Sequence, residues 1–260
     1  MQRILMCPPT YFDVVYEINP WMHKGEKIDH ALANGQWTAL KKSYQEKGVH
    51  VEEITSVAGL PDMVFSANSG IVFGHKFIVS NHRYSQRKGE EKYYADWFVK
   101  HGFEVHRLHS HQSGEGDALW FKNKLYLGYG FRSDREAIDE VGKILGVAPV
   151  ALHLVNPYFF DFDMAFCPIG DRVLMYYPEA FDSESQTLID QLHPTVKLNR
   201  AEANQFECNS VLVGNTLFMS GIDNKLKEQI ESYGIKVRLF DVSEFRKSGG
   251  GIKCMTLTIK

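Results

Sequence analysis

The chain has 260 residues, of which 44% are hydrophobic, and its formal net charge is −3. A chain of this length and composition can bury a large core, in one domain or in two small ones. The charge balance leaves no strongly basic surface, which argues against a nucleic acid or an anionic lipid surface as partner and favours a small molecule.

The beginning of the chain, its apolar runs and its cysteines exclude further classes. The residues before the first expected strand are too few for a signal peptide, and no apolar run has the length of a membrane span. We therefore expect a soluble, cytoplasmic protein. The cysteines are too sparse for a disulfide scaffold and fit no zinc spacing, so we expect reduced thiols and no metal at Cys7, Cys167, Cys208 and Cys254.

A pair of short apolar strands around a tight turn recurs along the chain. The first strands begin near residues 70, 117, 164 and 210, so the repeat is about 47 residues long, a period typical of radial or stacked architectures. The four hairpins are expected over residues 71–79, 118–127, 164–176 and 210–220.

Each hairpin is followed by a segment with the apolar spacing of a helix and then by a lone strand. The expected pairs of helix and strand are 89–101 with 103–108, 134–145 with 149–152, 182–192 with 196–198, and 223–233 with 235–239. Aspartates are expected as helix N-caps and glycines as helix stops. These residues are Asp134, Asp182 and Asp223, and Gly102, Gly146 and Gly234.

The last unit has only one strand of its hairpin at the C-terminal end of the chain, within residues 254–259. Residues 3–6 can supply the other strand, and residues 37–45 and 49–54 the helix and the lone strand. Closing a ring in this way removes exposed sheet edges. We therefore predict a five-bladed, pseudo-symmetric α/β propeller, a single domain of five repeats over residues 1–260. A doubly wound parallel sheet is the alternative, which the frequent hairpins disfavour.

Three consecutive glycines precede a cysteine near the end of the chain, at residues 249–251. They allow a sharp turn and a close approach of the backbone to a ligand. Cys254 is expected at the start of the last strand, beside Lys253 and free backbone amides, in surroundings that favour the reactive thiolate. The alternative is a buried structural cysteine behind a flexible turn.

Polar residues stand at the start of the first strand in every unit. If five hairpins surround one axis, these residues converge at one end of the central channel. Several carboxylates facing a cysteine form a cation-binding site that contains a nucleophile. A guanidinium, a planar cation with several hydrogen-bond donors, suits such a site. The converging residues are Asn68, Glu115, Asp117, Asp161, Asp163, Asn209 and Cys254.

Motifs spread over nearly the whole chain resemble those of one superfamily. They lie at residues 6–9, 18–22, 61–68, 114–119, 208–209 and 249–254. With them the chain resembles the pentein, or guanidino-group modifying, superfamily, and most of all its bacterial arginine dihydrolase and dimethylarginine dimethylaminohydrolase-like branch. The resemblance implies the five-bladed fold, and a hydrolase whose cysteine attacks the guanidinium carbon of arginine or a close relative and forms a covalent thiouronium. It implies no metal and no organic cofactor.

The same resemblance implies roles for single residues. Cys254 corresponds to the nucleophile and Asp163 to a ligand of the guanidinium. Arg87 and Arg132 are candidates for binding the substrate carboxylate, with a solvated surface position as the alternative. Two asparagines of the substrate pocket and the other converging polar residues complete the expected substrate-binding set, namely Asn19, Asn68, Glu115, Asp117 and Asn209.

Two positions depart from the pattern of that branch. Asp161 stands where the branch has the histidine of a His-Leu-Asp motif, and Ser113 where it has the acid of Glu-Gly-x-Gly-Asp. We expect Asp161, with a pKa raised by nearby carboxylates, to exchange protons as a catalytic residue. A histidine from a loop could also approach the site, the candidates being His109, His111 and His153. The alternative to a hydrolase is a catalytically silent member that binds a cationic ligand or a partner protein.

Overall fold

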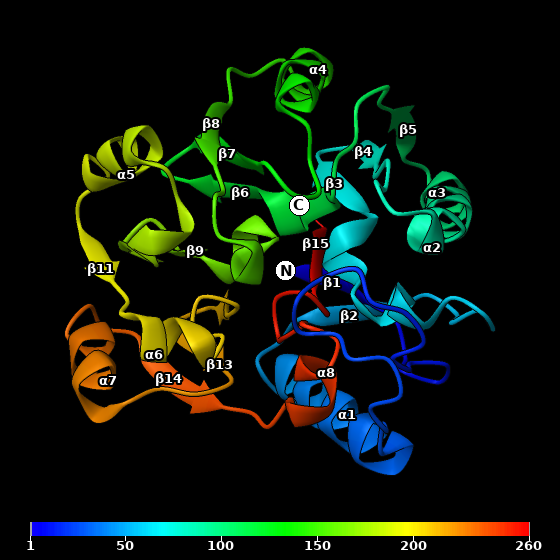
Figure 1. The fold of residues 1–260 in the computed structure, drawn as a ribbon, viewed down its shortest axis with the longest axis horizontal. Coiled ribbons are helices and arrows are strands. Elements are labelled where there is room, and N and C mark those ends of the chain that lie inside the picture. The colour runs from blue at the N-terminus through cyan, green and yellow to red at the C-terminus, as the bar shows by residue number, and fades with distance from the viewer. Residues whose placement is uncertain (1, 260) are drawn as a thin grey trace.

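The computed structural model describes residues 2–259, and within this range the strands form five separate three-stranded sheets. Figure 1 shows the sheets arranged around a central axis, with the longer helices on the outside of the ring. In four sheets an antiparallel hairpin is extended by a third strand that runs parallel to the second strand of the hairpin. This arrangement confirms the predicted five-bladed propeller.

The four blades with complete hairpins follow the predicted period. Each uses two short strands of mostly buried residues and a third strand at the rim. Their strands are β3 (Gly70–Phe73), β4 (Lys76–Val79) and β5 (Glu104–Arg107); β6 (Ala118–Phe121), β7 (Lys124–Tyr129) and β8 (Val150–His153); β9 (Phe166–Ile169), β10 (Val173–Tyr176) and β11 (Thr195–Lys197); and β12 (Val211–Val213), β13 (Thr216–Met219) and β14 (Lys236–Leu239).

The fifth blade joins the two ends of the chain. Strand β1 (Arg3–Met6) lies in the middle of this sheet, antiparallel to β15 (Leu257–Ile259) and parallel to β2 (His50–Glu53). In its register Ile4 pairs with Thr258 and with Val51. The predicted closure by the terminal strands is thus confirmed, and Figure 1 shows β1 and β15 side by side near the centre.

Helices connect the sheets on the outer side. The longer ones are α1 (His30–Glu46), α3 (Glu90–Lys100), α4 (Arg135–Leu145), α5 (Ser183–Asp190) and α7 (Asn224–Glu231), and the short ones are α2 (Ser85–Lys88), α6 (Arg200–Asn204) and α8 (Ser243–Arg246). Helix α1 begins earlier than expected because Asp29 caps it, accepting a hydrogen bond from the Leu32 amide at 2.9 Å. Between residues 2 and 259, no helix combines the length and the apolar character needed to cross a membrane.

Two of the three predicted aspartate caps make the expected hydrogen bond. Asp182 and Asp223 each accept one from a backbone amide three residues later. Asp134 occupies the N-cap position of α4, but its carboxylate instead accepts hydrogen bonds from His111 and Arg83. Gly146 ends α4 in the left-handed conformation, at φ 71°, as predicted for a glycine stop.

Closure of the ring can be tested in the buried terminal strand. Leu5→Ala removes a fully buried side chain from β1, so we expect the free energy of unfolding to fall by about 2–5 kcal/mol because a cavity remains. Leu32→Ala, on the exposed side of α1, is the matched control and is expected to cost less than about 1 kcal/mol. Urea denaturation of both variants measures the difference, and equal losses would contradict the central place of β1.

Candidate active site

The Cys254 thiol lies at the centre of the ring, buried, with 4% of the residue exposed. The side-chain amide of Asn209 donates to Cys254 Sγ at 3.1 Å, while its carbonyl oxygen accepts from the amides of Lys253 and Cys254 at 2.9 and 3.3 Å. Asn209 therefore fixes both the backbone and the sulfur of Cys254. The cysteine sits in a turn, and β15 begins only at Leu257, three residues later than the expected strand.

The glycine run is required by close packing on three sides. A Cβ atom at Gly250 would lie 2.0 Å from the Phe65 ring, and one at Gly251 would lie 2.6 Å from Asn209 Oδ1. Gly249 has a φ of 76° and packs against Asn19, whose side chain donates to the Ser248 carbonyl at 3.1 Å. Asn19 thus braces the turn that presents Cys254.

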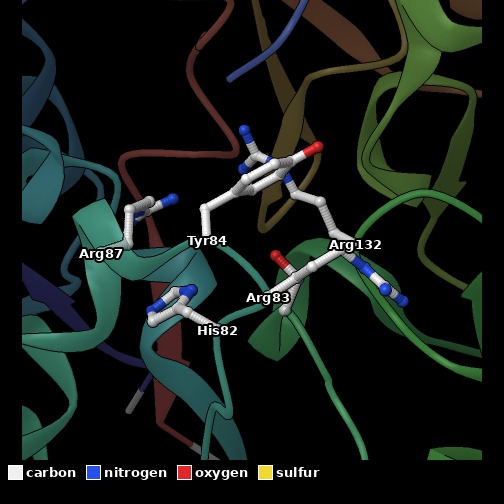
Figure 2. A pocket seen from close by; sticks show the side chains of 6 residues that line it. His82, Arg83, Tyr84, Arg87 and Arg132 are labelled. Carbon is white, nitrogen blue, oxygen red and sulfur yellow. The ribbon is translucent and has the colours of Figure 1, made fainter. Parts of the chain in front are cut away.

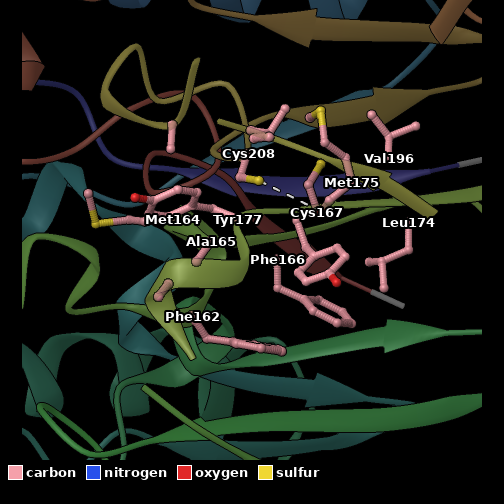
Figure 3. Packing of buried hydrophobic residues seen from close by; sticks show 14 of the residues in the cluster. Phe162, Met164, Ala165, Phe166, Cys167, Leu174, Met175, Tyr177, Val196 and Cys208 are labelled. Carbon is pink, nitrogen blue, oxygen red and sulfur yellow. Dashed lines mark hydrogen bonds between the residues drawn. The ribbon is translucent and has the colours of Figure 1, made fainter. Parts of the chain in front are cut away.

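Two buried aspartates, Asp161 and Asp163, lie just before the first strand of the third blade, and Asp163 contacts the thiol. Cys254 Sγ lies 3.6 Å from Asp163 Oδ2. Between the two aspartates, Phe162 stacks on Phe166 with ring centroids 4.4 Å apart, and Figure 3 shows this pair within the packed apolar cluster. Phe162 anchors the segment, so Asp161 and Asp163 are held on either side of a buried ring.

Asp161 is held by three neighbours. Its Oδ2 atom accepts from Asn68 Nδ2 and from Arg132 Nη1, each at 3.1 Å, and its Oδ1 atom accepts from Ser113 Oγ at 3.2 Å. The Arg132 guanidinium also lies 4.2 Å from the centroid of the Phe160 ring. The two positions that depart from the branch pattern, 113 and 161, are therefore bonded directly to each other.

Burial and neighbouring charge keep protons in this cluster. Burial raises the pKa of Asp163 well above its ordinary value, and the Asp161 carboxylate raises it further, while Lys253 opposes the shift. Burial also raises the pKa of the Cys254 thiol, with Asp163 and Asp161 adding to the effect. The expectation of a thiolate-favouring environment is therefore wrong for the free site, because burial and the two carboxylates outweigh the hydrogen bonds that lower the pKa of the thiol.

Glu115 and Asp117, both expected to bind the substrate, have hydrogen-bond partners within the protein. Glu115 Oε2 accepts from Lys253 Nζ at 2.9 Å and from the Thr258 amide at 2.8 Å. Asp117 accepts from the Phe162 amide at 2.8 Å and from Ser133 Oγ at 2.6 Å. Both residues lie in a 3-10 helix, Gly114–Asp117, with three residues per turn, which points them to different sides.

Arg87 and Arg132 are both buried, at 2% and 7% exposure, so the alternative of a solvated position is wrong for both. The Arg87 guanidinium forms a two-pronged ion pair with Glu90, at 2.8 Å for each bond, and donates to Asn68 Oδ1 at 2.9 Å. Burial alone lowers the pKa of Arg87, but Glu90 outweighs it and the net shift is upward. Arg87 thus orients Asn68 toward Asp161.

The three histidines considered as substitutes for the missing catalytic histidine do not contact the site residues described above. His111 and His153 pair with the N-cap residues Asp134 and Asp182 at 2.9 and 3.1 Å, and His109 is exposed. The histidine near the site is His82, which the sequence reasoning missed. In the antiparallel hairpin the end of β4 lies beside the start of β3. A polar residue just after β4, such as His82, could therefore have been predicted to lie near the site.

Two pockets open beside these residues. A small one of about 10 Å³ is lined by His82, Ser113, Arg132 and their neighbours (Figure 2). A larger one of about 380 Å³ is lined by Asn19, Arg132 and Phe160, among others. Among residues 2–259, no group of three or more His, Cys, Asp or Glu side chains is placed to hold a metal ion.

The raised pKa of Asp117, about 8, predicts a pH dependence of stability. Its first cause is burial, and Asp161 adds to it. Asp117 takes up protons on folding between its unfolded pKa and about pH 8, so its contribution is fully present below the unfolded pKa and is lost as the pH rises. We expect Asp117→Asn, compared with the wild type, to gain in relative stability from about pH 4 to about pH 8. Thermal unfolding across this range checks it; the exposed Asp139→Asn is the control, and parallel curves for wild type and Asp117→Asn would contradict it.

Known proteins share this fold and these sequence motifs. The family model for N,N dimethylarginine dimethylhydrolase, eukaryotic, matches residues 15–260. The bifunctional arginine dihydrolase/ornithine cyclodeaminase ArgZ of Synechocystis is 38% identical over 99% of this chain, and the match covers 37% of ArgZ. The N(G),N(G)-dimethylarginine dimethylaminohydrolase of Mycobacterium tuberculosis is 34% identical over 99% of this chain and 86% of its own length.

Solved structures agree with the sequence comparisons. The substrate-bound N-terminal domain of ArgZ, described as an arginine dihydrolase, superposes with a TM-score of 0.97 at 37% identity, covering 100% of this chain and 98% of that one. A dimethylarginine dimethylaminohydrolase adduct at 19% identity shares the fold, with a TM-score of 0.82 over 99% of both chains. This chain spans little more than a third of full-length ArgZ and of AgrE from Nostoc. By sequence and by fold, the chain belongs to the N,N dimethylarginine dimethylhydrolase family, with the five-bladed pentein architecture.

Proposed function

We propose that this chain hydrolyses a guanidino compound, arginine or a close relative, with Cys254 as nucleophile and a covalent thiouronium as intermediate. The observation that carries the proposal is the Cys254 thiol 3.6 Å from the Asp163 carboxylate, inside a buried cluster of aspartates. A guanidinium bound by Asp163 brings its carbon next to the sulfur. The similarity to ArgZ supports this reading, since the N-terminal domain of ArgZ has been solved covalently bound to a reaction intermediate.

A cationic substrate reverses the electrostatics of the free site. The positive charge offsets the carboxylates that raise the pKa values of Cys254 and Asp163, so both groups ionise more readily once the guanidinium is bound. The thiolate then attacks the guanidinium carbon, and a C–S bond forms. The proton released from the thiol passes through the aspartates to the departing nitrogen as the C–N bond breaks.

The second half of the reaction regenerates the thiol. Water adds to the thiouronium carbon, its proton passes to the aspartate cluster, and the C–S bond breaks. Asp161 is the proposed proton carrier, because it lies two residues from Asp163 and acts electrostatically on both Asp163 and the Cys254 thiol. The thiolate is reprotonated from the same cluster, so the cycle consumes one water molecule and releases one amine.

The rest of the substrate is proposed to occupy the pocket of about 380 Å³ that contains Asn19, Arg132 and Phe160. Arg132 is the better candidate for a substrate carboxylate, since it lines this pocket and has a single ion-pair partner among residues 2–259, Asp161. Arg87 has four of its five donors engaged by Glu90, Asn68 and the Asp62 carbonyl. We assign Arg87 to holding Asn68 in place.

Replacing the nucleophile tests the proposal directly. Cys254→Ser is expected to lower turnover of arginine or a related guanidine by at least about 100-fold, because a hydroxyl is a much weaker nucleophile at neutral pH. Mass spectrometry of the quenched wild type should show an adduct on Cys254 that the variant lacks. Cys7→Ser, in the core of the fifth blade, is the control and should keep the adduct; normal turnover by Cys254→Ser excludes Cys254 from the mechanism.

One observation favours a second function, that of a silent binding protein. Asp161 already has three partners within the protein, which leaves less of its carboxylate free for proton transfer. If the wild type binds guanidines without turnover, the double substitution Asp161→His and Ser113→Glu is expected to create hydrolysis, because it restores an imidazole oriented by an acid. Product analysis by mass spectrometry and binding by calorimetry separate the two functions, and turnover by the wild type rules out the silent reading.

A further inference from the structure

The small pocket beside Asp161 is lined by four buried polar side chains and by the more exposed Arg83 and Tyr84. It lies between the segment after β4, which carries His82, and the segment after β7, which carries Arg132, and Ser113 also lines it. Figure 2 shows His82 next to Arg87 at this pocket. Its volume is about 10 Å³, which matches one water molecule. His82 is 5% exposed, so its ring is almost wholly enclosed.

Two buried nitrogen atoms of the pocket residues lack a hydrogen-bond partner among residues 2–259. They are His82 Nε2 and Arg132 Nε, and both are buried. Buried polar atoms in native proteins are paired with protein or with ordered water. Arg132 Nε can only donate, whereas a neutral His82 Nε2 can accept, so one water that accepts from the first and donates to the second would satisfy both atoms. This pairing places the ring proton of His82 on Nδ1.

The pocket connects to the reacting centre through one side chain. Ser113 lines the pocket, and its hydroxyl donates to Asp161 Oδ1 at 3.2 Å. Arg132 makes a parallel connection, since its Nη1 donates to Asp161 Oδ2 at 3.1 Å. A single water in the pocket therefore completes a path of hydrogen bonds from His82 to Asp161.

We propose that His82 is the group through which protons enter and leave the aspartate cluster, by way of one water and Ser113. The proposal rests on the proposed hydrolase function. When Asp161 is protonated, its hydrogen bond with Ser113 reverses and the serine hydroxyl turns to the water. Asp161 then gives its proton to Ser113 Oγ, the serine proton passes to the water, a water proton passes to His82 Nε2, and the Nδ1 proton passes to a solvent water molecule. Reversal of these transfers restores the starting tautomer, and no other reactant is consumed.

Burial and the charges around His82 favour a neutral imidazole in the resting enzyme. Burial lowers the pKa of His82 well below its ordinary value, and Arg87, Arg132 and Lys88 lower it further. The Glu91 carboxylate accepts a hydrogen bond from the backbone amide of His82 at 2.9 Å. A neutral imidazole accepts at one nitrogen and donates at the other, so it can pass a proton on without holding a charge. His82 is thus a positioning and relay residue that does not touch the substrate.

Three variants test the relay by turnover. His82→Ala is expected to lower kcat by about 100-fold with KM changed less than about twofold, and added imidazole is expected to restore part of kcat. His82→Gln keeps a hydrogen-bonding side chain but cannot relay, so its kcat should stay low. His153→Gln, at a histidine paired with Asp182 away from the site, should behave as the wild type. Full kcat in His82→Gln, or no rescue of His82→Ala by imidazole, overturns the proposal.

A second measurement does not depend on turnover. In nitrogen NMR spectra of the whole protein, His82 is expected to be neutral at pH 7 with its proton on Nδ1, and Ser113→Ala is expected to shift its Nε2 signal. A proton on Nε2, or a signal indifferent to Ser113→Ala, overturns the relay even if the wild type turns over guanidines. If the NMR result is as expected but the wild type does not turn over guanidines, the proposed hydrolase function is refuted. The water-bridged contact between His82 and Ser113 then stands, but the proton relay does not.

Discussion

The burial of the Asp161 carboxyl group is the constraint on which the site depends. A carboxylate with 1% exposure is stable only when its lone pairs are satisfied and a cation lies near. Three blades contribute to this: the first provides Asn68, the second Ser113 and Arg132, and the third Asp161 itself. Behind Asn68 stands the ion pair of Arg87 with Glu90. The ring brings these segments together, so the fold and the electrostatics of the site cannot be separated.

The same arrangement of buried carboxyl groups makes the thiol of the free site unreactive. Because burial and the aspartates raise the pKa of the Cys254 thiol, the sulfur rests protonated and is a weak target for oxidants and alkylating compounds. A guanidinium is the kind of ligand that removes this protection, since its charge acts on the sulfur and on Asp163 together. Reactivity is then coupled to the arrival of a cation, which limits side reactions of the nucleophile in the absence of substrate.

Features with a long period in the sequence were predictable, and features of side-chain direction were not. The repeat of about 47 residues led to the five blades and to the convergence of Asn68, Asp163, Asn209 and Cys254. The directions of the Glu115 and Asp117 side chains depend on a short 3-10 helix that the sequence periodicity does not predict. The burial of Arg87, in the short helix α2, depends on Glu90, three residues later at the start of α3. His82 was missed because only the starts of the first strands were considered, although the second strands end at the same side of the ring.

Strand β1 lies in the middle of the fifth sheet and pairs with β15, so the order of synthesis matters for this fold. The four blades with continuous hairpins contain local contacts and can form while the chain is still being made. The fifth sheet joins residues about 250 positions apart, which is slow to close and has to wait for the last strand to leave the ribosome. Cys254 lies just before that strand. A nascent chain therefore carries an open sheet edge at β1 until β15 has been synthesised, and Cys254 reaches its aspartates only at that stage.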